Sequence, residues 1–170
     1  MARFRTDNAL DCSAETYWEK VFLDDEYNRR LFLDELHFTE WREVERKEDG
    51  GKTKRVIRAT PRVGDVPAAL KAVIADGAGY EERGVLDSKQ QRYEVQAIPN
   101  RLADKISIKV TMTTTPTPDG RCRLIVEGEI AARIFVIGSL LEQRLVADLR
   151  RSYDKSAAFI NRFVAEKSLK

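Results

Sequence analysis

The sequence predicts an α+β fold in which a curved antiparallel β-sheet wraps around one long C-terminal α-helix. The first observation is a run of extended segments, broken by turn residues, that fills most of residues 37–131. The second is one amphipathic pattern over residues 139–167, long enough for a helix of about 43 Å. Because this pattern lacks the charged flanks of a coiled-coil heptad repeat, we expect the helix to lie across the sheet.

Residues 2–10 predict a first strand, and two short helices follow it. Ser13 is a good N-cap for a first helix through residues 17–22, where apolar side chains recur at helical spacing. A second helix is predicted over residues 24–36, with an aspartate at its start as the cap. We expect the first helix to pack Trp18 against the sheet.

Residues 37–60 predict a β-hairpin. Two extended segments, 37–48 and 52–60, flank the tripeptide Asp49-Gly50-Gly51. The Asp-Gly pair supplies the positive φ angles that a tight hairpin turn requires, so the turn is predicted at this point.

Residues 61–79 interrupt the strands with a short amphipathic helix. Asp65 can cap this helix, and Gly77 and Gly79 mark a hinge after it. The Gly-x-Gly spacing lacks the third glycine and the following helix of a phosphate-binding loop, so no nucleotide cofactor is expected. The apolar face of the short helix is formed by Val66, Leu70, Val73 and Ile74.

Four further strands are predicted over residues 80–86, 90–98, 106–115 and 121–131. The last three alternate so that one face of the sheet is almost purely apolar. This face consists of Tyr93, Val95, Ala97, Ile106, Ile108, Val110, Met112, Cys122, Leu124 and Val126. The C-terminal helix presents a matching stripe of Leu141, Leu145, Leu149, Tyr153, Ile160 and Phe163, with Glu142, Arg150, Arg151 and Lys155 largely off it.

The order of these elements resembles the START-like superfamily, also called helix-grip or SRPBCC. The likeness is carried by residues 80–87, 93–99, 106–115, 121–128 and 140–164, which are similar to a bacterial START-like family of unknown function. The chain also resembles, more distantly, the PRELI lipid-transfer domains of mitochondria. In those domains a loop helix before the middle strands acts as a lid, and residues 66–74 are similarly placed here.

The resemblance implies an apolar cavity between the sheet and the C-terminal helix. From the strand and helix patterns alone, a solid core is favoured, since packed interiors are the rule. A cavity would be lined by Tyr93, Val95, Ala97, Ile106, Ile108, Val110, Met112, Leu124, Val126, Leu141, Leu145, Leu149 and Tyr153. Its gate would be formed by Val66, Leu70, Val73 and Ile74.

Composition narrows the classes of partner. A chain of 170 residues suits a single domain spanning 1–170, and 30 Lys and Arg against 28 Asp and Glu do not favour nucleic acid. Cys12 and Cys122 are expected to be reduced thiols, and His37 has no neighbours that would suggest a metal site. The charged N-terminus and the absence of a long apolar run predict a cytoplasmic protein whose membrane contact would be peripheral.

The leading functional hypothesis is a non-enzymatic carrier or sensor for a lipid, sterol or other hydrophobic small molecule. A cyclase-type enzyme using the same pocket is the first alternative, and a protein-binding module like the chaperone activators of the superfamily is the second. Among polar strand residues, an inward-facing Arg58 or Glu82 would orient a ligand headgroup, whereas Glu94 and Gln96 are expected to face solvent.

Overall fold

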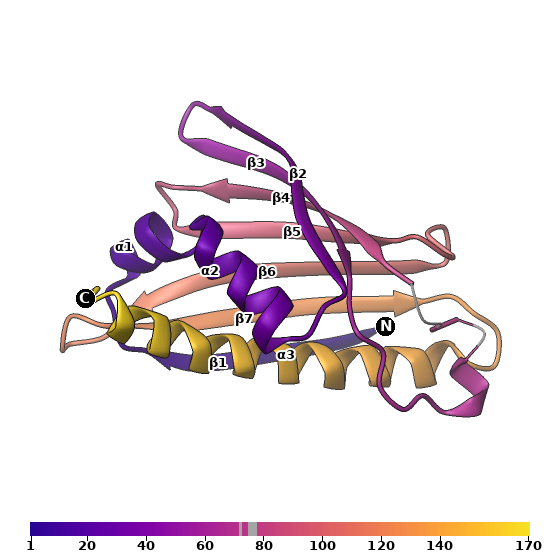
Figure 1. The fold of residues 1–170 in the computed structure, drawn as a ribbon. Helices are drawn as coiled ribbons and strands as arrows, with labels where there is room; N and C mark the ends of the chain where they lie inside the picture. The colour runs from indigo at the N-terminus through magenta and orange to yellow at the C-terminus, as the bar shows by residue number, and fades with distance from the viewer. Residues whose placement is uncertain (72, 75–77) are drawn as a thin grey trace.

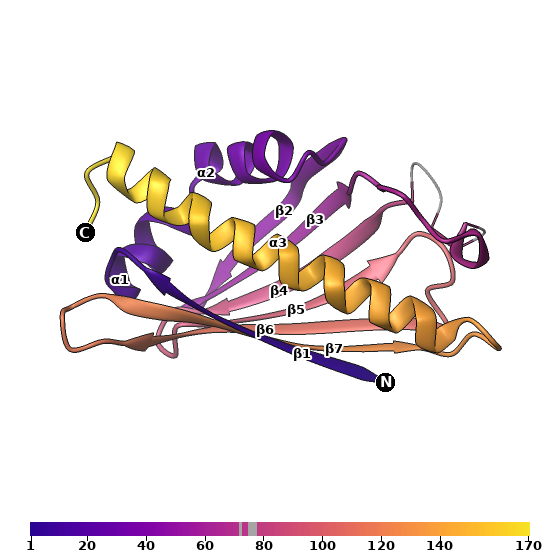
Figure 2. The same cartoon turned by 90° about the horizontal axis from the view of Figure 1, so that it is seen from below.

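The computed structural model describes residues 1–71, 73–74 and 78–170. Seven antiparallel strands form one sheet in the order β1-β7-β6-β5-β4-β3-β2, and the long helix α3 lies across it (Figures 1 and 2). The α+β helix-grip fold predicted from the sequence is therefore confirmed. The strands are β1 Ala2–Leu10, β2 Glu40–Asp49, β3 Lys52–Thr60, β4 Tyr80–Asp87, β5 Arg92–Pro99, β6 Ile106–Pro116 and β7 Cys122–Ala132, and α3 is Gly138–Glu166.

Two short helical segments connect β1 to β2, and both end in a π-helical turn. The first is α1, Ala14–Thr16, followed by η1, Tyr17–Val21, and the second is α2, Asp25–Arg29, followed by η2, Arg30–Glu35. Ser13 and Asp24 cap α1 and α2 through their side-chain oxygens, as predicted. The π-turns were not predicted, because their i to i+5 hydrogen bonds leave no simple periodic signature in a short segment.

The β2–β3 hairpin has the predicted turn but a later start. Gly50 and Gly51 have φ angles of 59° and 82°, and Asp49 pairs with Lys52 across the turn. The first strand begins at Glu40, not at residue 37, because the chain leaves η2 through a tight turn in which His37 has a φ of 57°. The positive φ prevents that residue from joining the strand.

The apolar stripe of α3 packs on the sheet as predicted, with one correction at its N-terminal end. Leu141, Ile160 and Phe163 are buried. Glu142, expected off the stripe, is also buried, because its carboxylate accepts a hydrogen bond from the Ala132 backbone N–H at 2.9 Å and lies 3.1 Å from the N-terminal amino group. The Ala132 hydrogen bond lowers the pKa of this carboxyl group, and burial only partly opposes it.

The helix in the connection between β3 and β4 starts later than predicted. Among the described residues of this connection, Ala68–Leu70 form a 3₁₀ turn, η3, which starts after the extended Pro67, so Asp65 does not cap it. Leu70 is fully buried in a second apolar cluster with Ile106, Ala132 and Leu141. Ala72 and residues 75–77, which include Asp76 and Gly77 of the predicted hinge, lie outside the described residues.

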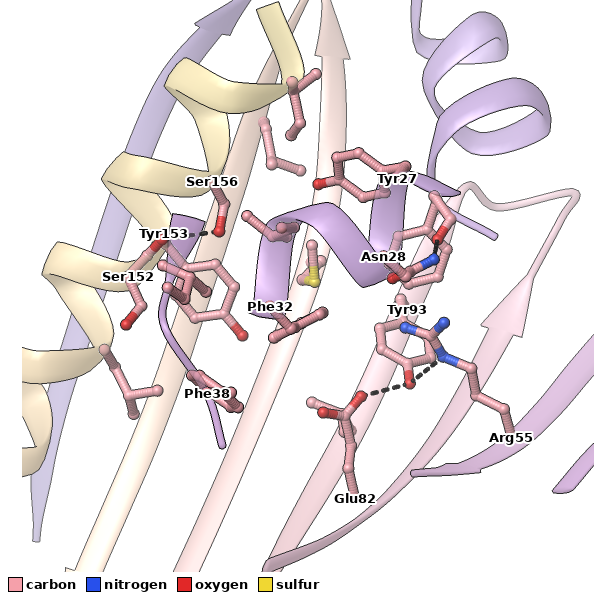
Figure 3. Close-up of a pocket in the computed structure, with 18 of the residues that line it drawn as sticks. Tyr27, Asn28, Phe32, Phe38, Arg55, Glu82, Tyr93, Ser152, Tyr153 and Ser156 are labelled. Atoms are coloured by element: carbon pink, nitrogen blue, oxygen red, sulfur yellow. Dashed lines mark hydrogen bonds between the residues drawn. The ribbon is translucent and has the colours of Figure 1, made fainter. Parts of the chain in front are cut away.

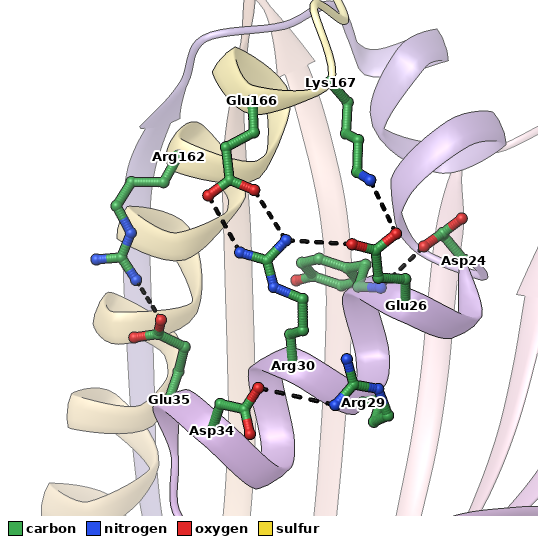
Figure 4. A network of polar contacts seen from close by, with 10 residues as sticks. Asp24, Glu26, Arg29, Arg30, Asp34, Glu35, Arg162, Glu166 and Lys167 are labelled. Carbon is green, nitrogen blue, oxygen red and sulfur yellow. Dashed lines mark hydrogen bonds and ion pairs between the residues drawn. The ribbon is translucent and has the colours of Figure 1, made fainter.

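Ion pairs attach the segment formed by α2 and η2, here called the helical arm, to the C-terminal end of α3 (Figure 4). Arg30 donates to both carboxylate oxygens of Glu166 at 2.8 and 3.1 Å, and Lys167 lies 2.9 Å from Glu26. Beneath them the ring of Tyr27 stacks on that of Phe159, with centroids 5.7 Å apart. The arm is thus held over the sheet by aromatic packing below and by exposed charges above.

Two further predictions concern the thiols and the membrane. Cys12 and Cys122 are free and buried, in agreement with the predicted thiols. The hydrogen bond between the Cys12 and Cys122 thiols, together with burial, raises the pKa of Cys12 far above its usual range, so this thiol stays protonated. Within the described parts of the chain, no helix combines the length and apolar character that crossing a membrane requires.

Candidate functional site

A cavity of about 110 Å³ lies between the sheet, the C-terminal half of α3 and the helical arm (Figure 3). Its walls combine side chains from η1, the arm, the inner face of the sheet and one face of α3. The lining residues are Tyr17, Phe22, Tyr27, Asn28, Leu31, Phe32, Leu36, Phe38, Arg55, Tyr80, Glu82, Tyr93, Val95, Met112, Leu124, Leu149, Ser152, Tyr153, Ser156 and Ile160.

The wall of the cavity is rich in aromatic side chains. Eight of the twenty lining residues are aromatic, and they include all five tyrosines of the chain. Burial raises the pKa of every one of these tyrosines above its usual value. The cavity therefore presents ring faces together with neutral phenol groups that both donate and accept hydrogen bonds.

One part of the wall carries a hydrogen-bonded chain of three polar side chains (Figure 3). Arg55 donates from Nε to the hydroxyl of Tyr93 at 3.1 Å, and that hydroxyl donates to Oε1 of Glu82 at 2.8 Å. Burial and the Glu82 charge raise the pKa of Tyr93, which keeps its hydroxyl protonated and able to fill both roles. The Tyr93 hydroxyl thus links the buried Arg55 cation to the Glu82 carboxylate through two hydrogen bonds.

Arg55 is the most deeply buried charge at the cavity, with 4% of its surface exposed. Its guanidinium group lies 4.7 Å from the centroid of the Phe22 ring and 5.2 Å from that of Tyr93. Burial alone would lower its pKa, but the neighbouring Tyr93 and Glu82 outweigh that effect and raise it, so the side chain stays charged. Cation–π contacts and one hydrogen bond stabilise this cation away from water.

Gly84 makes room for the polar chain. A Cβ atom at this position would lie 1.8 Å from the hydroxyl oxygen of Tyr93 and 2.2 Å from the adjacent ring carbon. Gly84 pairs with Arg55 on one side and with Val95 on the other, in the middle of the sheet. The Tyr93 ring therefore lies flat over a strand position that only glycine can occupy.

The predicted lining residues fall into two groups in the structure. Tyr93, Val95, Met112, Leu124, Leu149 and Tyr153 line the cavity. Val110 and Val126 are buried in the core, Ile106 and Leu141 belong to the second apolar cluster, and Ala97, Ile108 and Leu145 are half-buried. All thirteen lie on the faces expected from strand and helix periodicity, and whether the second group contacts a ligand stays a prediction.

The predicted gate lies next to the second apolar cluster. Leu70 is fully buried there, and Val66, Val73 and Ile74 are half-buried against it. This cluster is at the N-terminal end of α3, where it includes Leu141, whereas the cavity lies beside the C-terminal half of the helix. Where the cavity is not walled by the sheet, η1 or α3, it is covered by the helical arm and by Phe38, which follows the arm.

Sequence reasoning missed the arm and Arg55. The arm residues have a helical apolar pattern, which could have placed Tyr27 and Leu31 at the site if the arm had been expected to cover the sheet. Arg55 alternates in step with the buried Thr53 and Ile57 on β3, and this spacing could have predicted that its side chain faces inward. Of the two residues named as possible headgroup contacts, Glu82 lines the cavity, whereas the Arg58 side chain is 56% exposed on the outer face. Glu94 and Gln96 face solvent, as predicted.

The polar residues of the site do not form a metal-binding cluster. Across residues 1–71, 73–74 and 78–170, no group of three or more His, Cys, Asp or Glu side chains could hold an ion. The polar groups that the structure places together at the site are the Arg55 cation, the Tyr93 phenol and the Glu82 carboxylate.

Comparisons with known proteins identify the family and support the fold. The family described as "Protein of unknown function (DUF2505)" matches residues 6–164. No curated protein sequence matches the chain. Among solved structures, the protein TTHA0849 from Thermus thermophilus is 14% identical, with a TM-score of 0.65 and coverage of 98% of this chain and 99% of that one.

Two enzymes also share the fold. The Zhui aromatase/cyclase from Streptomyces sp. R1128 is 12% identical, with a TM-score of 0.69 and coverage of 98% and 95% of the two chains. Norcoclaurine synthase from Thalictrum flavum is 18% identical, with a TM-score of 0.60 and coverage of 97% and 87%. These likenesses confirm the START-like, or SRPBCC, fold that the sequence predicted.

Replacing Gly84 with Ala tests the packing of the polar chain. The new methyl group would displace the Tyr93 ring, so we expect a loss of about 1–3 kcal/mol in the free energy of unfolding, measured with urea. Gly64→Ala is the control, because a Cβ there meets no described atom within 4 Å and should change stability by less than about 0.5 kcal/mol. Equal stability of the two variants would contradict the close packing at Gly84.

Proposed function

We propose that this chain, which belongs to the DUF2505 family of unknown function, binds a hydrophobic small molecule in the cavity beneath the helical arm and acts as its carrier or sensor. The observation that carries the proposal is the cavity itself, which is walled mainly by apolar and aromatic side chains inside an otherwise packed core. Transfer of the ligand's apolar surface from water would supply the affinity, at about 25 cal/mol per Å².

The size of the cavity bears on how a ligand enters. At about 110 Å³ it is smaller than the roughly 300–1,000 Å³ of most ligand pockets and close to an apolar cavity that takes up benzene. A lipid or sterol would therefore require outward movement of a wall element. The helical arm is the wall best suited to move, because exposed ion pairs form much of its attachment to α3, while its contact with the sheet includes the Phe32 ring stacked on Trp41 of β2 at 4.9 Å.

A cyclase-type enzyme is the second candidate, and a specific observation favours it. Arg55, Tyr93 and Glu82 place a cation, a phenol and a carboxylate in one hydrogen-bonded chain on the cavity wall. Such groups can polarise a carbonyl oxygen or move a proton. Mass spectrometry of the ligand that co-purifies, before and after incubation with fresh protein, separates the two functions, since a carrier returns its ligand unchanged.

Filling the cavity tests the binding proposal. We expect Met112→Trp to reduce uptake of the fluorescent probe N-phenyl-1-naphthylamine at least tenfold while the protein remains folded, because the indole would occupy the ligand volume. Ile108→Trp on the same strand is the matched control, since its side chain faces inward but does not line the cavity. Undiminished uptake by a folded Met112→Trp protein would refute binding at this site.

The gate at Val66, Leu70, Val73 and Ile74 is part of the proposal and has its own test. In a carrier this segment would open the space between the sheet and the N-terminal end of α3 and touch a membrane, so changing Leu70 and Ile74 together to Ser should slow lipid exchange between vesicles. If the segment only closes the core, the double variant should instead show a lower melting temperature and unchanged exchange. Measuring melting temperature and exchange on the same samples decides between these roles.

A further inference from the structure

Arg55 has more hydrogen-bond donors than the described protein supplies acceptors. A guanidinium group carries five N–H donors, and here Nε alone donates to a described partner, the Tyr93 hydroxyl. Nη1 is fully buried and makes no hydrogen bond to a described residue. Its nearest carboxylate oxygen, on Glu43, is 3.8 Å away, and Glu43 is already paired with Arg46 at 2.7 Å. A buried cation with unpaired N–H donors destabilises the fold unless an acceptor forms hydrogen bonds with them.

Arg55 is a lining residue of the cavity, and Glu82 does not use its remaining donors. The two aromatic rings beside Arg55 fix the guanidinium plane, and the Tyr93 hydroxyl stands between it and the Glu82 carboxylate (Figure 3). The terminal nitrogens are therefore not occupied by Glu82. Carboxylate, sulfonate and phenolate oxygens match the fork of an arginine and form short, charge-assisted hydrogen bonds with it.

We infer that the ligand is a compact ring compound bearing an acidic or phenolic oxygen, and that Arg55 binds that oxygen. This inference rests on the proposed function and adds the class of ligand to it. The ring is indicated by the aromatic wall, because planar rings pack on Tyr and Phe faces better than flexible chains do, and by the small volume of the cavity. Arg55 is then a specificity determinant that distinguishes such a ligand from a purely apolar one of the same shape.

Two probes with the same ring system test this inference. 8-Anilinonaphthalene-1-sulfonate carries an anionic oxygen group, and N-phenyl-1-naphthylamine lacks it. We expect the protein to bind the sulfonate roughly tenfold or more tightly, by the usual strength of a hydrogen bond to a charged group. Arg55→Met should remove this preference, so that the ratio of the two affinities falls to about one. Arg58→Met, on the outer face of the same strand, should preserve the preference.

The outcomes separate the inference from the proposed function. Equal affinity for the two probes, or a preference that survives in Arg55→Met, overturns the role of Arg55 but leaves the cavity as a binding site. Failure of both probes to bind overturns both proposals. If Arg55→Met does not fold, Arg55→Lys supplies the test. Lysine keeps the positive charge but lacks the paired N–H donors of the guanidinium group, so the preference for the sulfonate should be smaller than in the parent but not absent.

The connection between β7 and α3, residues 133–137, carries a second and independent feature. Phe135 is 94% exposed and Val136 is 82% exposed, while the flanking Ile134 and Ile137 pack against the second apolar cluster. Hydrogen bonds from Ile137 N–H to the Phe135 carbonyl and from Gly138 N–H to the Ile134 carbonyl close a tight turn. Val136 has a φ of 71°, which is unfavourable for a β-branched residue. The fold thus maintains a strained turn that presents two apolar side chains to the outside.

Exposed cations lie at the same end of the molecule as this tip. The Arg133 N–H donates to the Lys105 carbonyl at 2.8 Å, so the β5–β6 loop lies directly beside it. Arg101, Lys105 and Arg133 are exposed and form no ion pair with a described residue, and the same holds for Lys71 of the β3–β4 connection at this end of the molecule (Figure 1). Asp104 is the acidic residue in the β5–β6 loop. An apolar tip within a net positive rim is complementary to an anionic lipid surface.

We propose that Phe135 and Val136 insert into the interfacial region of an anionic membrane, with Arg101, Lys105 and Arg133 on the headgroups. The protein should bind vesicles of equimolar phosphatidylcholine and phosphatidylserine and should bind pure phosphatidylcholine much more weakly. Changing Phe135 and Val136 together to Ser should weaken binding roughly tenfold or more. Lys105→Gln with Arg133→Gln should weaken it about fivefold per cation.

Matched controls come from the opposite end of the sheet. Val44→Ser removes another exposed apolar side chain, and Lys52→Gln with Lys54→Gln removes two exposed cations of β3 that form no ion pair with described residues; neither change should affect sedimentation with vesicles. The proposal is overturned if the parent does not bind anionic vesicles or if the tip variants bind as well as the parent. It is also overturned if the Phe135 and Val136 change converts a dimer in solution to a monomer, which would make the tip an interface between copies of this chain.

Discussion

The packing of one face of α3 across the sheet is the contact on which the remaining structure depends. At the N-terminal end of the helix, Leu141 joins Ile106 and Ala132 in a closed apolar cluster. At the C-terminal end, Phe159 and Phe163 pack against Tyr27 of the helical arm, which holds the arm away from the strands. The cavity forms between the arm, the helix and the sheet, where three surfaces meet without interdigitating completely. A shorter helix would support the closed cluster but not the arm.

Polarity is distributed unevenly around the cavity. Most of the wall is apolar or aromatic, and the charged groups are gathered where β3, β4 and β5 run side by side. Gly84 allows the Tyr93 ring to cross β4, and this brings the Tyr93 hydroxyl between Arg55 and Glu82. A hydrophobic residue in place of Arg55 would cost less to bury, and the proposed binding of a ligand oxygen would account for a cation at this position.

The sequence predicted those parts of the site that follow from regular periodicity. Alternation on β5, β6 and β7 placed Tyr93, Met112 and Leu124 on the inner face, and helical spacing placed Leu149 and Tyr153 opposite them. It could not place the arm, because the position of a short helix depends on tertiary contacts and the π-turn η2 alters its register. Arg55 was missed because charged residues on both faces of β3 obscure the alternation that would have revealed it.

The ion pairs over the helical arm connect the ionic strength of the solution to the mobility of the cavity roof. Glu26, Glu166 and Lys167 are exposed and Arg30 is partly exposed, and such pairs contribute little individually and are screened by salt. The packing of the α3 stripe on the inner face of the sheet is apolar and has no comparable dependence. Raising the salt concentration should therefore loosen the roof before it affects the core, so that exchange of a bound molecule becomes faster while the unfolding transition of the sheet hardly moves.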